Sequence, residues 1–195
     1  MIDKRHETII LNEILKPRKN TKNFADIING FNKKLEEMDF KNRAIKISDY
    51  FGEGSGKYTA KDKLISNGIV KKDWFKYGDD DFPGMYVFIH DKKPFYFGIA
   101  KGVIQRILQH VKGINHNQAT LAYNIAQIYY REQNGQEYNG TREKFEFKKY
   151  VEPIKDFLME QYISFINIDD SDELYLFEVY CSLKYQTILN SFETH

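Results

Sequence analysis

Residues 84–100, GMYVFIHDKKPFYFGIA, decide the fold because two apolar runs flank a short polar turn. Within each run the residue character changes with a period of two, which is the period of side chains along a β-strand. The stretch therefore predicts an antiparallel hairpin with its turn at residues 91–93. One of its two faces is continuously apolar, so we also expect helices to cover that face.

The register of this hairpin bears on function. With a symmetric turn, residue 90 faces residue 94 and Tyr86 faces Gly98. Tyr86 and Tyr96 then share one face, and the missing side chain at Gly98 leaves open space beside the Tyr86 ring, which predicts a small pocket. The alternative is that both tyrosines are present because aromatic residues are common on half-buried sheets. A shift of one residue in the register would remove the pocket.

Helical periodicity surrounds the hairpin on both sides. Apolar residues recur there at three- and four-residue steps, which predicts amphipathic helices. A third strand is expected at residues 162–168, YISFINI. The fold class is therefore α+β, a small antiparallel three-stranded sheet flanked by helices, with a helical N-terminal extension. Helices are expected around residues 10–15 and 24–38 with a polar hinge at 16–20, from 103 to the glycine at 113, from 118 to 131, after Pro153, and from about 172 to 189 with a cap from Asp170, Ser171 or Asp172.

Length and composition exclude several classes of protein. With 195 residues, of which 42% are hydrophobic and 15% aromatic, the chain can bury the core of one domain, or of one domain with an extension. The formal net charge of +1 creates no global field for a polyanion, so any nucleic-acid surface must be local. Cys181 is the only cysteine, which excludes an internal disulfide framework and a cysteine-rich zinc site. Because neither an apolar run of membrane length nor a signal peptide is evident, we expect a soluble, cytoplasmic protein with no membrane partner.

The most basic stretch lies at residues 41–76, where nine Lys and Arg against four Asp and Glu give a local charge of +5. Glycines at 52, 54 and 56 mark a flexible loop within it. The stretch is either an arm that contacts phosphates or, more simply, the solvated face of an extension. Three aspartates follow at residues 79–81, and they indicate an acidic loop, because consecutive carboxylates do not converge on one metal ion without an unusual backbone.

Two polar residues lie on the helix after the hairpin. Arg106 and His110 are four residues apart, so they project from one face of that helix. The arginine offers a planar fork of donors suited to a phosphate, or else an ion pair with a carboxylate elsewhere. The histidine, taken alone, is more typical of a structural side chain than of a base.

Glu178 lies in the final helix within the segment LYLFEVYC, residues 174–181, where its neighbours are apolar or aromatic. A carboxylate buried there loses hydration at a cost on the order of several kcal/mol unless a cation compensates it. The compensating group is either a partner arginine or a divalent cation with few protein ligands and several waters, as is typical of magnesium at a phosphate.

Together these residues form a known pattern. Gly84-Met85-Tyr86 and Tyr96-Phe97-Gly98, with nine residues between them, resemble the paired signature of the GIY-YIG nuclease family, although Met85 and Phe97 replace the usual isoleucines. An arginine and a histidine on the next helix, a glutamate on a helix after a third strand and an asparagine twelve residues later also match. The matched positions are Tyr86, Tyr96, Arg106, His110, Glu178 and Asn190.

The resemblance implies a GIY-YIG-like nuclease domain over residues 81–195, with an insertion at about 115–160, preceded by a helical basic extension over residues 1–80. It implies a divalent-metal-dependent endonuclease that hydrolyses phosphodiester bonds in DNA, with Mg²⁺ or Mn²⁺ as cofactor. The compact arrangement is more typical of a restriction-type enzyme than of a member with a long trailing DNA-binding segment. The alternatives are a nucleic-acid-binding module that kept the nuclease fold without cleaving, and an interaction protein whose aromatic surface meets a partner.

The resemblance also implies a role for each central residue. Tyr86 would activate or orient the attacking water, and Tyr96 would support it from the shared face. Arg106 would hold the scissile phosphate, and Glu178 would anchor the metal ion.

Three other residues have expected supporting roles. Because a free phenol has a pKa of about 10, Tyr86 would need help from a neighbour to act as a base, and His110 is the candidate for that neighbour. Asn190 would position neighbouring groups rather than react. His116, in the insertion, is a weaker candidate than His110 for any histidine role.

Overall fold

The computed structural model of the chain describes residues 12, 14, 15 and 23–190. The helix expected around residues 10–15 and the hinge at 16–20 therefore lie largely outside the described residues. Contacts divide the chain into a unit that ends at Gly30 and a compact unit formed by residues 31–195. Residues 31–80 thus pack in the same unit as the hairpin, and the division at residue 80 stays a prediction about which residues carry the nuclease-like pattern.

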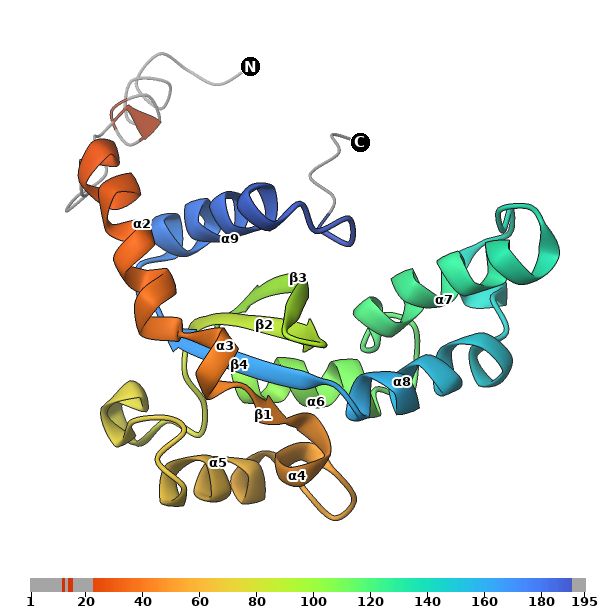
Figure 1. Cartoon of the computed structure of the whole chain (residues 1–195), viewed down its shortest axis with the longest axis horizontal. Helices are drawn as coiled ribbons and strands as arrows, with labels where there is room; N and C mark the ends of the chain where they lie inside the picture. The colour runs from red at the N-terminus through yellow and green to blue at the C-terminus, as the bar shows by residue number, and fades with distance from the viewer. Residues whose placement is uncertain (1–11, 13, 16–22, 191–195) are drawn as a thin grey trace. The chain divides into compact units, whose positions relative to one another are not determined.

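The centre of the larger unit is a four-stranded antiparallel sheet (Figure 1). Its strands are β1 (Ile45–Lys46), β2 (Gly84–His90), β3 (Lys93–Ala100) and β4 (Tyr162–Asn167), in the spatial order β1-β4-β2-β3. The expected α+β class is confirmed, and so are the three strands that the alternating pattern predicted. The prediction of only three strands is wrong because β1 has two residues, too few to show a period in the sequence.

The hairpin register is correct at the functional end and wrong at the turn. Tyr86 pairs with Gly98 as predicted, but His90 pairs with Lys93 and not with residue 94. The turn has two residues, Asp91 and Lys92, with φ of 47° and 62°. Two left-handed residues match the twist of the flanking strands better than a longer loop does. An irregularity between Phe88 and Ile89 then shifts the pairing by one residue and restores the predicted partners.

Five of the described helices, those over residues 24–38, 103–112, 120–134, 152–159 and 171–185, lie where the periodicity predicted them, whereas the three short helices between residues 40 and 66 were not predicted individually. The final helix ends four residues earlier than expected because Gln186 adopts a left-handed conformation with φ 53°. The π-helical turn at 147–151 precedes the helix that contains Pro153. The helices are α2 (Phe24–Met38), α3 (Phe40–Arg43), α4 (Ile47–Phe51), α5 (Lys57–Ser66), α6 (Val103–Lys112), α7 (Thr120–Asn134), α8 (Glu152–Met159) and α9 (Ser171–Tyr185).

Helices cover both faces of the sheet. On one face Tyr86 and Phe88 belong to the buried cluster that includes the apolar residues of α6. On the other face Phe97 packs against Tyr185 at the end of α9, with ring centroids 5.5 Å apart. Figure 1 shows α6 and α9 on opposite sides of β2 and β3. Six of the seven residues of β2 are buried, as expected for a central strand covered on both sides.

The insertion at 115–160 adds a group of packed aromatic rings to the hydrophobic core. Phe145 contacts the rings of Tyr130, Tyr138 and Tyr150 at centroid distances of 5.8, 4.9 and 5.3 Å. The ring of His116 packs against Phe145, and its Nε2 lies 2.9 Å from the Phe145 carbonyl oxygen. His116 is therefore part of this packing, which separates it from the tyrosine face of the hairpin.

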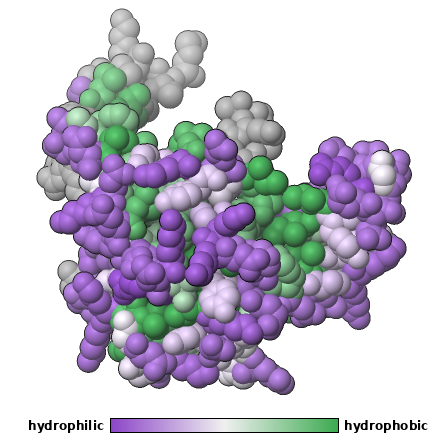
Figure 2. Space-filling view, in the orientation of Figure 1, coloured by the Kyte–Doolittle hydropathy of each residue, from purple (hydrophilic) through white to green (hydrophobic). Residues whose placement is uncertain are grey.

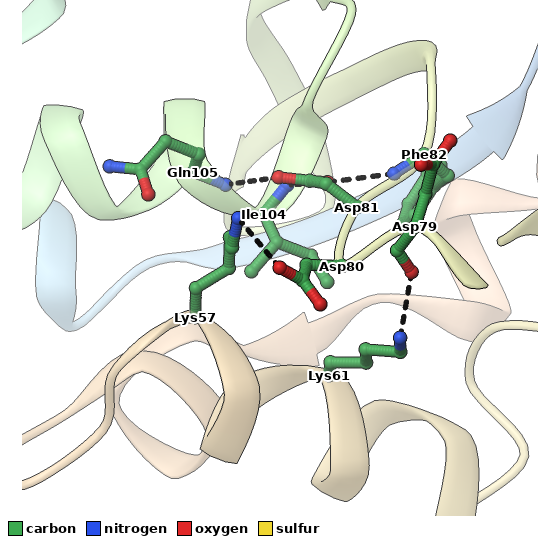
Figure 3. Close-up of polar contacts among 8 residues, drawn as sticks. All are labelled: Lys57, Lys61, Asp79, Asp80, Asp81, Phe82, Ile104 and Gln105. Atoms are coloured by element: carbon green, nitrogen blue, oxygen red, sulfur yellow. Dashed lines mark hydrogen bonds and ion pairs between the residues drawn. The ribbon is translucent and has the colours of Figure 1, made fainter.

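Asp81, in the acidic loop, caps the first turn of α6 (Figure 3). One carboxylate oxygen of Asp81 accepts hydrogen bonds from the backbone N–H groups of Phe82 and Ile104 at 2.9 Å, and the other accepts from Gln105 at 2.8 Å. These N–H groups of α6 have no partner within the helix, so Asp81 caps it from 23 residues upstream. A Cβ at Gly102 would lie 2.9 Å from this carboxylate, which explains why a residue without a side chain precedes the helix.

Part of the basic stretch contacts the same loop. Lys57 forms an ion pair with Asp80 at 3.5 Å, and Lys61 donates to the carbonyl oxygen of Asp79 at 2.7 Å (Figure 3). These contacts favour the interpretation of a solvated, self-paired face for these two lysines. Across the described residues, no helix combines the length and apolar character needed to span a bilayer.

The Asp81 cap gives a stability prediction. Asp81→Ala removes acceptors for two helix N–H groups and should lower the free energy of unfolding by about 1–2 kcal/mol. The matched control is Asp80→Ala, which loses partly exposed contacts with Lys57 and Tyr58 and should cost about 1 kcal/mol or less. Urea denaturation of the three proteins measures both values. Equal losses in the two variants would contradict the capping role.

Candidate functional site

The Tyr86 hydroxyl is the centre of the candidate site. Tyr86 is completely buried, and a Cβ atom at Gly98 would overlap the end of its ring. The space opposite Gly98 is therefore filled by the tyrosine ring, and the expectation of an open pocket there is wrong. The missing side chain instead lets the ring lie across β3, so that the hydroxyl reaches α6.

His110 holds the Tyr86 hydroxyl in place. Its Nε2 lies 2.7 Å from the Tyr86 oxygen, and its Nδ1 accepts a hydrogen bond from the backbone N–H of Leu121 at 3.4 Å. Because Nδ1 accepts, the proton of the neutral ring resides on Nε2 and is donated to Tyr86. Burial, and next the charge of Arg106, hold the pKa of His110 well below its usual value, so the ring stays neutral.

Tyr86 and Tyr96 are two buried phenols that lie near the Arg106 guanidinium. Burial raises the pKa of Tyr86 well above 10, and the nearby Arg106 guanidinium acts in the opposite direction. Burial likewise raises the pKa of Tyr96, and the Arg106 guanidinium again acts in the opposite direction. The two phenol rings lie beside each other with centroids 6.2 Å apart, so one guanidinium acts on both hydroxyls.

Arg106 is available to an anion. Its Nη1 donates to Oε1 of Gln109 at 3.1 Å, one turn along α6. Among the described residues it forms no ion pair, so the alternative of a carboxylate partner finds no support there. A guanidinium that has a neutral partner and lies beside Tyr86 retains donors for a phosphate.

Glu178 lies on the other side of Tyr96, around the edge of the sheet. The spatial order places β3 at this edge, so Tyr96 can meet α9, the helix that covers the opposite face. A pocket of about 430 Å³ lies here, lined by Tyr96, Asn124, Tyr175, Glu178, Val179, Leu189 and Asn190. Burial raises the pKa of Glu178 to about 7, and the charge of this carboxylate contributes to the raised pKa of Tyr96.

Asn190 joins the edge strand to Glu178. Its Oδ1 accepts from the Phe97 N–H and from the Thr187 hydroxyl, each at 3.0 Å, and its Nδ2 donates to the Phe97 carbonyl oxygen. The carboxamide thus occupies the place of a further strand beside β3. The same Nδ2 lies 3.5 Å from Oε1 of Glu178. This geometry suits the positioning role expected for Asn190.

Within the described part of the chain, Glu178 is the one carboxylate that lines this pocket, so a divalent ion bound there would have a single protein carboxylate as its ligand. Over the described ranges no group of three or more His, Cys, Asp or Glu side chains could hold a metal ion together. Glu178 has no cation within salt-bridge distance among these residues, and burial is the only cause of its raised pKa. A cation in the pocket would offset that desolvation, and a hard ion such as Mg²⁺ commonly keeps several waters in addition to one or two carboxylates.

The structure brings the predicted residues together in two adjoining groups. Tyr86, Arg106 and His110 meet inside the face covered by α6, while Glu178 and Asn190 flank the pocket at the edge. Tyr96 belongs to both groups.

Sequence reasoning missed four contributors. Tyr175 precedes Glu178 by three residues on α9, a spacing that could have identified it. Gln109 could have been found in the same way from Arg106. Asn124 and the N–H group of Leu121 come from the insertion, and no local signal connects either of them to the hairpin.

The His110 geometry predicts a specific pair of variants. His110→Leu leaves the buried Tyr86 oxygen without its donor, and should lower the free energy of unfolding by about 1–3 kcal/mol. His110→Gln keeps an N–H near the position of Nε2 and should recover at least half of that loss. Imidazole ¹⁵N NMR of the wild-type protein should show Nε2 protonated and Nδ1 unprotonated. A proton on Nδ1 would contradict the assignment.

Glu178 predicts a pH dependence of stability. An acid whose pKa is higher in the folded than in the unfolded state binds its proton more tightly when folded. This stabilisation is complete below about pH 4.5 and is lost as the pH rises through about 7. Because the group is partly exposed, we expect a contribution of about 1–2 kcal/mol.

The matched variant is Glu178→Gln, in which denaturation measured across this pH range should show a smaller slope. Mg²⁺ should stabilise the wild-type protein near the upper end of the range and leave the variant unchanged. Identical pH profiles for the two proteins would contradict the assigned protonation.

Comparison with protein-family models, with curated proteins and with solved structures gives no match.

Proposed function

We propose that this protein is a divalent-metal-dependent endonuclease of the GIY-YIG type that hydrolyses phosphodiester bonds in DNA. The observation that carries the proposal is the contact between the Tyr86 hydroxyl and His110, with Arg106 beside it and Tyr96 leading to the Glu178 pocket. These side chains come from three separate elements: the hairpin, α6 and α9. A structural core does not require a buried phenol, a neutral imidazole and a guanidinium to meet at one oxygen.

The polarity around Tyr86 supports a role in orienting the attacking water. To deprotonate that water, Tyr86 would first have to lose its own proton, and burial opposes this strongly. His110 in this tautomer and the Arg106 guanidinium are both donors at this oxygen, so neither can accept that proton. Tyr86 therefore acts as a neutral hydroxyl that the Nε2–H group of His110 holds in place.

The remaining roles follow from charge. Arg106 binds the scissile phosphate and offsets the charge that develops on it in the transition state. Glu178 holds the divalent ion, Mg²⁺ or Mn²⁺, and Asn190 fixes its carboxylate against the edge of the sheet. When bound, such an ion stabilises the negative charge on the leaving oxygen.

A restriction-type enzyme is the proposed class within this function. The insertion carries α7, whose Asn124 reaches the Glu178 pocket, so a segment outside the minimal pattern contributes to the candidate site. A segment of this kind suits an enzyme that selects its substrate as well as cutting it.

A cleavage assay tests the function. With plasmid DNA and Mg²⁺, Arg106→Ala and Glu178→Ala should each lower the cleavage rate by about 10²-fold or more while folding normally. Excess chelator should abolish cleavage by the wild-type protein. The matched controls are Lys33→Ala and Glu152→Ala, which change exposed residues away from the pocket and outside the basic stretch, and should cut at the wild-type rate.

The outcomes separate the alternatives. Cleavage by either site variant at the wild-type rate would remove the role assigned to that residue. A wild-type protein that binds DNA with salt-dependent affinity but never cuts it would instead be a binding module with a retained nuclease fold.

A further inference from the structure

A second pocket continues from the Glu178 pocket along α7. It measures about 510 Å³ and lies between one face of α7 and the turn that follows α9. Asn124 and Leu189 line both pockets, so the two pockets adjoin at these residues. Figure 2 shows hydrophobic surface gathered where this turn approaches α7. We call the combined space the α7 groove.

One face of α7 lines the α7 groove with side chains that donate hydrogen bonds. Asn124, Gln127 and Arg131 are separated by three and four residues, so they lie on one face of α7 together with Ile128. Amides and guanidinium groups are the side chains that hydrogen-bond base edges and phosphates. Arg131 pairs with Glu132 at 3.7 Å, but both side chains are about half exposed or more, so a phosphate can replace that weak pair.

The opposite wall is largely apolar, with a carboxylate residue, Glu137, beside Tyr138 at the end where Arg131 lies. Ile188 is 83% exposed and stands beside Leu189, and Tyr138 lies at the same pocket. Tyr175, which is 63% exposed, lies at the Glu178 end. The bases of a nucleic-acid strand are flat and partly apolar, and a charged backbone joins them. Such bases would cover these apolar side chains, while the polar edges of the bases meet the donors of α7.

We propose that the α7 groove binds an unpaired nucleic-acid strand next to the linkage that is cut. This inference rests on the proposed function, because the groove begins at the Tyr96–Glu178 pocket. It assigns Asn124, Gln127 and Arg131 to binding of the flanking nucleotides. The chemical step remains with the residues around Tyr86.

The position of the donors favours an unpaired strand over a duplex. A helix that reads duplex DNA projects from the protein so that it can enter the major groove, which is about 12 Å wide. The donor face of α7 instead shares a pocket with Ile188 and Leu189, so it faces another wall of the protein. A single strand with its bases turned outward can enter between these walls.

Binding without cleavage tests the proposal. The probes are a fluorescein-labelled single strand of about 12 nucleotides and its duplex, measured by fluorescence anisotropy in chelator so that neither is cut. The double variant Gln127→Ala/Arg131→Ala should raise the Kd of the single strand by about tenfold, and that of the duplex by about twofold or less. Gln133→Ala, which changes an exposed residue outside the groove on the same helix, is the matched control and should bind as the wild type does.

A second variant guards against a folding artefact. Gln127→Glu keeps a good helix-forming residue and adds a negative charge that repels the strand, so it should weaken single-strand binding while the circular dichroism spectrum stays unchanged. Unchanged single-strand affinity in both variants, an equal loss for the duplex, or no single-strand binding by the wild type would each overturn the proposal. Failure of cleavage with intact, variant-sensitive binding would overturn the proposed function and leave the α7 groove standing.

Discussion

The hydrogen bond between Tyr86 and His110 depends on the absence of a side chain at Gly98. A single Cβ atom at that position would overlap the end of the tyrosine ring, and the ring could not lie across the edge strand. Its hydroxyl would then lose its place 2.7 Å from His110. A backbone position with no side chain thus fixes the Tyr86 hydroxyl inside the layer between the sheet and α6, where His110, Arg106 and Tyr96 surround it.

The surroundings of this oxygen are apolar, which makes each polar contact there consequential. A buried phenol or imidazole without a partner is costly, so the contacts with His110, Arg106 and Tyr96 stabilise the fold as well as defining a site. Glu178 differs because it lies at the rim and has an uncompensated carboxylate whose pKa is raised by burial. The inner group is thus satisfied by the protein itself, whereas no cation among the described residues compensates the carboxylate of the outer group.

Local patterns predicted much of the fold and the identities of the candidate residues, while long-range packing determined the rest. The alternation in the hairpin and the helical periodicities fixed β2, β3, β4 and most helices, and the Tyr86–Gly98 pair followed from them. The predicted turn was wrong by one residue, and the irregularity at Phe88 cancelled that error. Strand β1 was missed because two residues carry no period, and the share of the insertion in the site was missed because Asn124 meets Tyr96 only after the chain has folded back.

The contact between Leu121 and His110 has a consequence for regulation. Leu121 lies in the first turn of α7, where backbone N–H groups have no partner within the helix, and the imidazole accepts one of them. Fraying of that turn would free Nδ1 and allow the ring proton to move between the two nitrogens, so that Nε2 could change from donor to acceptor. A hydrogen bond thus connects the first turn of α7 to the imidazole that contacts the Tyr86 hydroxyl.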